Sequence, residues 1–198
     1  MPYVLAASYV GLFLIVFAET GLLLGFFLPG DSLLITAGFA AQKFPNEFSL
    51  VILIPLLIVA AVLGDATGYQ IGRQAGRRLF QREDSRWFRR SHLVRAEQFY
   101  ARHGGKTIVL ARFLALVRTF APTVAGAAGM PYAQFAMYNV AGGVLWVVSM
   151  TLVGYVLGQA VPNLDAVFLV VVGAVVLISV APAAWHFWRE HRASRSLR

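Results

Sequence analysis

Residues 107–130 read TIVLARFLALVRTFAPTVAGAAGM, an apolar run that is long enough to cross a membrane but contains Arg112, Arg118 and Pro122. A helix that faces lipid accommodates neither charged side chains nor a broken backbone, because no water is present in the bilayer core to satisfy them. Interrupted backbone at that depth occurs only where protein buries it or where it lines a wet cavity. The stretch therefore predicts a re-entrant hairpin that enters and leaves the membrane on one side.

Residues 19–42 form a second interrupted stretch, ETGLLLGFFLPGDSLLITAGFAAQ. It carries Glu19 and Asp31, and Pro29 and Gly30 in its middle are residues that favour a tight reversal of the chain. We expect a second re-entrant hairpin here. A further acid, Asp65, lies within the apolar run that follows.

The composition of the whole chain is that of an integral membrane protein. Of its 198 residues, 59% are hydrophobic and 13% are charged, and the mean hydropathy is +0.69. A soluble domain is about one quarter charged. A spanning helix needs about 20 mostly apolar residues, and the candidates are residues 3–18, 48–72, 132–158 and 165–188. The chain has no cysteine, which excludes disulfides, thiol catalysis and cysteine metal sites.

The basic residues predict the orientation. Residues 73–106 hold ten Lys and Arg against three acids, and residues 189–198 hold four Arg against one Glu. Such segments stay on the cytoplasmic side, so the basic loop 73–106 and the C-terminus are predicted to be cytoplasmic. An even number of crossings must then separate them, and residues 132–158 and 165–188 already supply two. This parity supports the hairpin at 107–130.

The two halves of the chain show weak self-similarity at an offset of 86–88 residues, with Gly68 and Gly72 aligned to Gly154 and Gly158. A unit of one hairpin and one span crosses the membrane an odd number of times, so its second copy must be inverted. We expect a single membrane domain over residues 1–198, all-α in class. It would contain inverted repeats at 19–72 and 107–158, an amphipathic cytoplasmic helix at 81–103 and a C-terminal span at 165–188.

Small residues mark the helix-packing faces of this bundle. A glycine recurs every fourth residue from Gly64 to Gly76, which is the pattern on which helices approach closely in membranes. In the second half, Asn139 and Trp146 share a helix face with Phe135, Gly142 and Gly143. Asn139 is expected to satisfy backbone groups of a hairpin, and a direct role in binding a ligand is the alternative.

The charged residues suggest a polar site between the hairpins. Guanidinium groups bind phosphate through paired, charge-assisted hydrogen bonds, so Arg112 and Arg118 are the candidate headgroup ligands. On one continuous helix they would lie roughly 240° apart. Glu19, Asp31 and Asp65 are candidate proton carriers or cation ligands, with Pro29, Gly30, Pro122 and Asn139 supporting the site. The alternative is that the acids and arginines only pair to hold the bundle together. The four histidines show no metal-ligand spacing, and neither a metal nor a cofactor is expected.

Four motifs in this order strongly resemble the DedA family, which carries the VTT (SNARE-associated) domain. They are Glu19 with Pro29-Gly30-Asp31, then Gly64-Asp65 with Gly68-Tyr69 and Gly72-Arg73, then Arg112-Phe113 with Arg118-Thr119, Pro122 and Ala125-Gly126, and then Phe135, Asn139, Gly142 and Trp146. The resemblance covers residues 19 to 160. It implies facing re-entrant hairpins in a bacterial inner-membrane protein that recycles undecaprenyl phosphate, with Glu19, Asp31, Arg112 and Arg118 essential.

The function that this resemblance implies is translocation of a phosphorylated polyprenyl lipid, with protons as the expected coupling ion. A proton-coupled antiporter for small cations and a general phospholipid scramblase are the alternatives. An assembly factor without transport activity is a further class. An enzyme is not expected, because no nucleophile is paired with a base. Membrane lipids and protons or a small cation are the predicted partners. Nucleic acid is not, since no RNA-binding motif accompanies the basic residues. A homodimer is left open.

Overall fold

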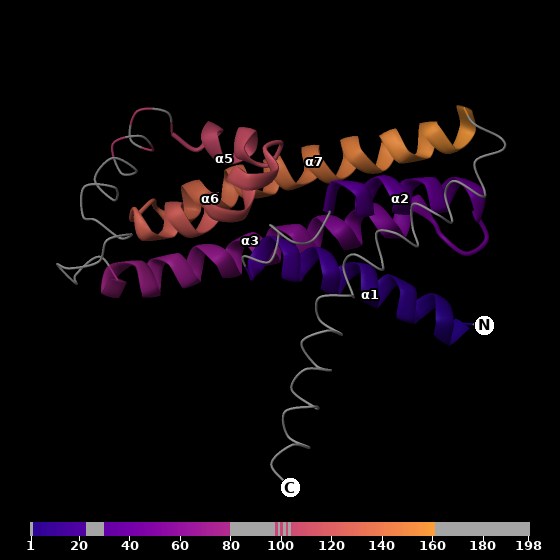
Figure 1. The fold of residues 1–198 in the computed structure, drawn as a ribbon, viewed down its shortest axis with the longest axis horizontal. Helices are drawn as coiled ribbons and strands as arrows, with labels where there is room; N and C mark the ends of the chain where they lie inside the picture. Colours follow the sequence, from indigo (N-terminus) through magenta and orange to yellow (C-terminus); the bar gives the residue numbers. More distant parts are fainter. Residues whose placement is uncertain are drawn as a thin grey trace, which may run out of the picture.

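The computed structural model describes residues 2–22, 30–79, 98, 100, 102 and 104–160, and every regular element in these ranges is a helix. The all-α prediction is therefore confirmed for this part of the chain. The helices, drawn in Figure 1, are α1 (Pro2–Gly21), α2 (Gly30–Lys43), α3 (Leu50–Leu79), α5 (Lys106–Ala111), α6 (Ala115–Ala127) and α7 (Tyr132–Ala160).

Two long helices, α3 and α7, pack together and run in opposite directions through the bundle (Figure 1). Both are long and apolar enough to cross a membrane, over Leu50–Ala75 and Tyr132–Ala160. The helices agree in place and length with the apolar spans predicted at 48–72 and 132–158. The predicted span at 3–18 lies within the shorter apolar helix α1. The predicted span at 165–188 lies outside the described residues.

The stretch 107–130 is broken, but at a different point from the one the sequence suggests. Helix α5 ends at Ala111 and α6 begins at Ala115, with Leu114 extended at φ −112° and ψ 102°. Pro122 instead lies inside α6, so the expected bend near this proline is wrong. A proline removes one hydrogen bond from a helix interior. Here its Cβ faces Gly68 of α3, so the ring packs against a smooth neighbouring helix.

The first interrupted stretch is divided between two helices. Helix α1 continues through Glu19 to Gly21, and α2 opens at Gly30 with Asp31 in its first turn. An acid is favourable at that position because the helix N-terminus carries a partial positive charge. Pro29 belongs to residues 23–29, which lie outside the described part of the chain.

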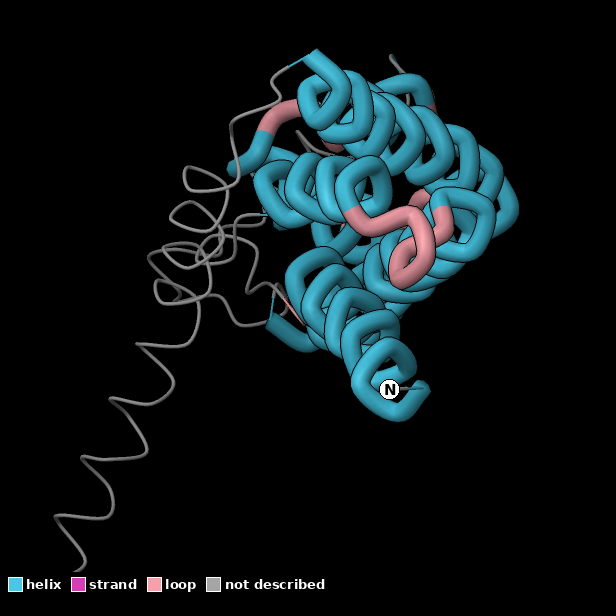
Figure 2. Tube along the Cα trace, turned by 90° about the vertical axis from the view of Figure 1, so that its right-hand side faces the viewer, coloured by secondary structure: helices cyan, strands magenta, loops and turns pink. Residues whose placement is uncertain are grey.

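Each shorter helix packs on the long helix from the other half of the chain. Helix α2 lies along α7, and α6 lies along α3. Glycines allow the backbones to touch. A Cβ on Gly38 would overlap the carbonyl of Thr151, and a Cβ on Gly126 would overlap the carbonyl of Tyr69. The loop that joins α2 to α3 lies at the end of the bundle where α1 starts, facing the viewer in Figure 2. The turn from α6 to α7 lies at the opposite end (Figure 1).

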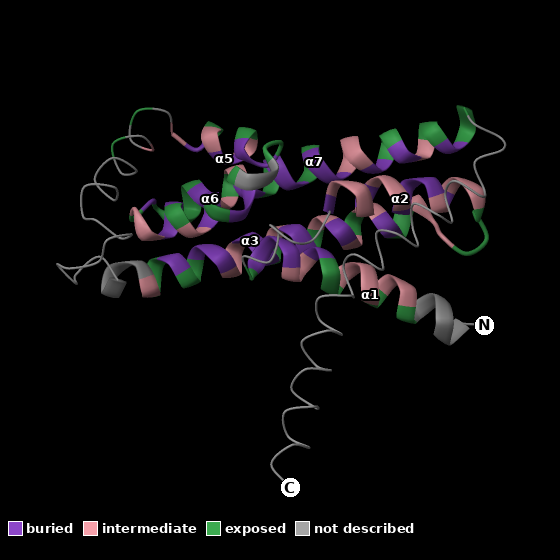
Figure 3. Cartoon of the chain, in the orientation of Figure 1, coloured by how far each residue is buried: buried purple, intermediate pink, exposed green. Residues whose placement is uncertain are grey.

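The bundle has apolar side chains on its outside and charged side chains within. Of the 18 consecutive residues that are most apolar in each of α3 and α7, 33% are buried. Figure 3 shows exposed residues along both helices. Large apolar side chains such as Val51 (82% exposed) and Met137 (59%) face outward, whereas Asp65 and Asn139 of the same helices are buried. Such a surface is stable in lipid and not in water, because exposed apolar area of this extent is costly to hydrate.

Two apolar clusters lie on either side of the buried polar groups. The first includes Leu57, Ala61 and Trp146, and the second includes Tyr69 and Phe135. Asp65 lies one helical turn from Ala61 and one turn from Tyr69 along α3, so the polar site falls between the clusters.

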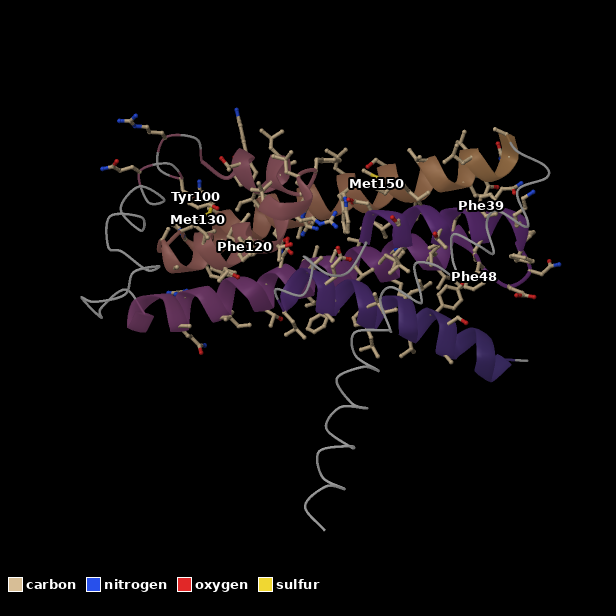
Figure 4. All side chains as sticks on the ribbon, viewed as in Figure 1. Phe39, Phe48, Tyr100, Phe120, Met130 and Met150 are labelled. Atoms are coloured by element: carbon tan, nitrogen blue, oxygen red, sulfur yellow. The ribbon has the colours of Figure 1, made fainter. Side chains whose placement is uncertain are left out.

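Side chains at the two ends of the bundle tie neighbouring elements together. Figure 4 places Phe39 and Phe48 at the end of the bundle opposite Tyr100 and Met130. Of the predicted amphipathic segment 81–103, only residues 98, 100 and 102 are described, and all three are helical. The Tyr100 hydroxyl donates a hydrogen bond of 3.2 Å to the carbonyl of Ala121, which ties this segment to α6.

Candidate functional site

All five ionisable residues singled out from the sequence meet in the middle of the bundle, in two groups of ion pairs. The structure buries Glu19, Asp65, Arg112 and Arg118 almost completely, each with at most 8% of its surface exposed. The Asp31 side chain differs, with 42% of its surface exposed. Burial of this many charges is sustained only when each has a partner.

The first group is centred on Arg118 of α6. Its Nη2 lies 2.7 Å from Oε1 of Glu19 on α1, and its Nη1 lies 2.5 Å from Oδ1 of Asp31 on α2. The two acids are 99 and 87 residues away in the sequence. One arginine therefore joins both helices of the first half to the second half.

The second group is centred on Arg112, which caps the C-terminus of α5. Its Nη2 lies 2.5 Å from Oδ2 of Asp65 and also donates a hydrogen bond to the side-chain oxygen of Asn139. Asn139 in turn donates from Nδ2 to the carbonyl of Val62 on α3, at 3.0 Å. Asn139 thus contacts helix backbone and an arginine together, and Asp65 lies apart from the other two acids.

The break between α5 and α6 brings the two arginines to one place. On a continuous helix they would point in different directions, but the turn at residues 112–114 lets both approach Trp146. The Cζ atoms of Arg118 and Arg112 lie 5.0 Å and 6.0 Å from the centre of its ring. Trp146 Nε1 also donates a hydrogen bond of 2.8 Å to Oδ1 of Asp31.

The sequence placed Trp146 on a helix-packing face and in the fourth motif of the resemblance, but gave it no role in the polar site. The available signal was its position on the same helix face as Asn139, two turns further along α7. A tryptophan seven residues from a buried asparagine is usually read as core packing. Only the meeting of α2, α6 and α7 reveals its polar contact.

Glycines make room for the buried charges. A Cβ on Gly30 would overlap the carboxylate of Glu19, and a Cβ on Gly142 would lie 3.1 Å from Cδ of Arg112. The predicted supporting residue Gly30 therefore borders the acid directly. Pro122 lies on α6, where it packs against α3, and Pro29 lies outside the described residues.

The site combines three acids with two arginines, so its net charge is −1 when all five are ionised. Among these five charged side chains, two buried atoms lack a hydrogen-bond partner: Oε2 of Glu19 and Nε of Arg112. Each acid faces a guanidinium, and within the described ranges no three His, Cys, Asp or Glu side chains gather as a metal site would require. Such an arrangement can exchange one anionic partner of an arginine for another.

Residues 28–156 match the VTT domain family. The chain is 47% identical to Protein DedA of Escherichia coli strain K12 over 94% of this chain and 84% of that protein. It is 41% identical to the membrane protein Rv0364 of Mycobacterium tuberculosis, with 94% and 81% covered. It is 40% identical to Inner membrane protein YqjA of E. coli K12, with 80% and 71% covered.

No solved structure matches the chain. The family match covers every residue of the two ion-pair groups except Glu19. The alignment with the DedA protein covers 186 residues, which is long enough to include Glu19. The outward apolar surface agrees with the membrane proteins named among these relatives. This chain belongs to the DedA family of membrane proteins.

Proposed function

We propose that this protein translocates a phosphorylated polyprenyl lipid, such as undecaprenyl phosphate, across the membrane without covalent chemistry. The observation that carries the proposal is the difference between the partners of Arg118. Glu19 is buried, whereas Asp31 is half-exposed. A phosphate arriving from the exposed side can take the place of the Asp31 carboxylate while Arg118 keeps a second partner.

Charge balance links this exchange to protons. A phosphate headgroup would add at least one negative charge to a site whose net charge is already −1. In a low-dielectric setting that repulsion is large, so at least one acid must accept a proton when the headgroup enters. Oε2 of Glu19, which is buried and without a hydrogen-bond partner, is the oxygen where that proton would reside.

The packing of the helices suits such a route. We infer inverted repeats at 19–72 and 107–158, in which residues 19–42 and 107–130 are re-entrant hairpins, with the basic loop 73–106 and the C-terminus on the cytoplasmic side. The contacts between the halves support this arrangement, because the contact of Gly38 with Thr151 corresponds to the contact of Gly126 with Tyr69. In this correspondence Gly72 matches Gly154, whereas the sequence comparison matched Gly154 with Gly68, one helical turn away. The relative YqjA is named an inner membrane protein, which is the location we propose here.

A proton-coupled cation antiporter is the main competing function. A cation at Glu19 or Asp31 would have to enter beside Arg118 and displace a guanidinium that is buried between both acids. An anion does not need to displace the buried guanidinium, since it replaces the partly exposed carboxylate of Asp31 beside it. A general phospholipid scramblase would use the same arginine without selecting the polyprenyl chain.

The decisive experiment is transport by the purified protein in proteoliposomes. Labelled undecaprenyl phosphate should cross faster than in empty vesicles, and labelled phosphatidylglycerol should not. The Arg118→Gln variant should lose this activity. Equal movement of both lipids would favour the scramblase, and cation flux without lipid movement would favour the antiporter.

A further inference from the structure

Trp146 and Arg118 donate hydrogen bonds to the same carboxylate oxygen of Asp31. The indole Nε1 donates to Oδ1 of Asp31 at 2.8 Å, and Nη1 of Arg118 donates to that oxygen at 2.5 Å. Trp146 is fully buried on α7. Asp31 is therefore fixed by one charged donor and one neutral donor that come from different helices.

The face of the indole meets both guanidinium groups. Arg118 lies 5.0 Å and Arg112 lies 6.0 Å from the ring centre, within the range of cation–π attraction. Trp146 thus contacts a member of each ion-pair group. A ring packed only for its volume would not need its N–H aimed at a carboxylate.

Binding of an anion by Arg118 changes the surroundings of Asp31. When the guanidinium turns its Nη1 donor to a headgroup, the indole N–H is the donor that Oδ1 retains. This hydrogen bond keeps Oδ1 of Asp31 beside the arginine, although 42% of the Asp31 side chain is exposed. An indole N–H only donates and carries no charge, so it can hold the carboxylate in both states.

We propose that Trp146 is a positioning residue that retains Asp31 while Arg118 binds the anionic headgroup. The inference rests on the proposed function, because it concerns the state with lipid bound. It assigns the indole N–H, and not the bulk of the ring, as the group that matters. Replacing Trp146 with Phe removes that N–H and keeps an aromatic face toward the arginines.

The test is a double-mutant cycle on binding of farnesyl phosphate, a short phosphorylated polyprenyl lipid, to the full-length protein in detergent. Farnesol is the uncharged control ligand. Trp146→Phe should weaken binding about tenfold, the effect of losing a hydrogen bond to a charged group. In the Asp31→Ala background the same change should alter binding less than about twofold, since no oxygen is left there to accept the hydrogen bond of the indole N–H.

The matched control is Phe135→Leu, which alters another fully buried aromatic residue of α7. Its effect on binding should be equal in the wild-type protein and in the Asp31→Ala background. Equal losses for Trp146→Phe in both backgrounds would overturn the inference and leave the proposed function standing. If the wild-type protein retained farnesol as well as farnesyl phosphate, the proposed function would fail and this inference with it.

Discussion

Arg112 and Asp65 form a buried ion pair, with Nη2 2.5 Å from Oδ2 and no more than 5% of either side chain exposed. Together with Asn139, the pair connects the end of α5 to α3 and α7. In the other group, 42% of the Asp31 side chain is exposed. Loss of an ionic partner should therefore cost more stability in the Arg112 group than at Asp31.

Replacing Arg112 with Gln should destabilise the protein by about 3–5 kcal/mol, because Asp65 is left as a buried charge without its partner. The double variant Arg112→Gln/Asp65→Asn should recover part of this loss. The midpoint of thermal unfolding in detergent measures both effects. Asp31→Asn is the comparison and should lower the midpoint less, because Asp31 is partly exposed and Arg118 keeps Glu19 as its partner. Equal midpoints for the two single variants would contradict this difference between the two ion-pair groups.

Replacing Gly30 with Ala should abolish transport while leaving the folded protein in the membrane. The added methyl group meets the carboxylate of Glu19, a flexible group that can move away from Arg118. Gly38→Ala is the matched change on the same helix. Its methyl group meets the backbone of Thr151, which can only move if α2 separates from α7.

The expected result for Gly38→Ala is thus loss of folded protein, measured by the amount extracted from membranes as a monodisperse peak. Lipid transport by reconstituted Gly30→Ala protein gives the other half of the comparison. Full transport by Gly30→Ala would show that Glu19 need not contact Arg118.

The orientation can be tested with single cysteines, since the chain has none of its own. Asn46 lies in the loop between α2 and α3, and Gln134 lies near the start of α7, and both are exposed. We expect a membrane-impermeant maleimide to label Asn46→Cys in intact cells. Gln134→Cys should react only after the membrane is opened. Labelling of both positions from outside would exclude the proposed arrangement of the hairpins.

Transport should decline as the pH rises, because ionised Glu19 repels a phosphate and retains Arg118. The groups that face Glu19 are Arg118 and Asp31, and Asp31 also meets Trp146. Glu19→Gln removes one ionisation and should flatten the pH dependence while lipid binding persists. Initial rates in proteoliposomes over a pH series measure this. A pH profile identical to that of the wild type would exclude Glu19 as the proton acceptor.

The sequence by itself determined the membrane class, the two long apolar helices and the five charged residues that meet inside the bundle. Apolar runs of spanning length with isolated charges leave few alternatives, because lipid cannot satisfy a lone Glu19 or Arg118. Glycine spacing likewise predicted which faces would pack. These conclusions depend on composition and local period, which a sequence displays directly.

Only the tertiary structure decided which charges are partners. The reversal falls at residues 112–114 and not at Pro122, and this turn brings Arg112 and Arg118 to one tryptophan. Pairing of Arg118 with Asp31 spans 87 residues, and no local pattern specifies it. The packing of α2 on α7 and of α6 on α3 fixes these distances. Close contact at glycines holds the helices in one position, which sets the neighbours of each buried charge.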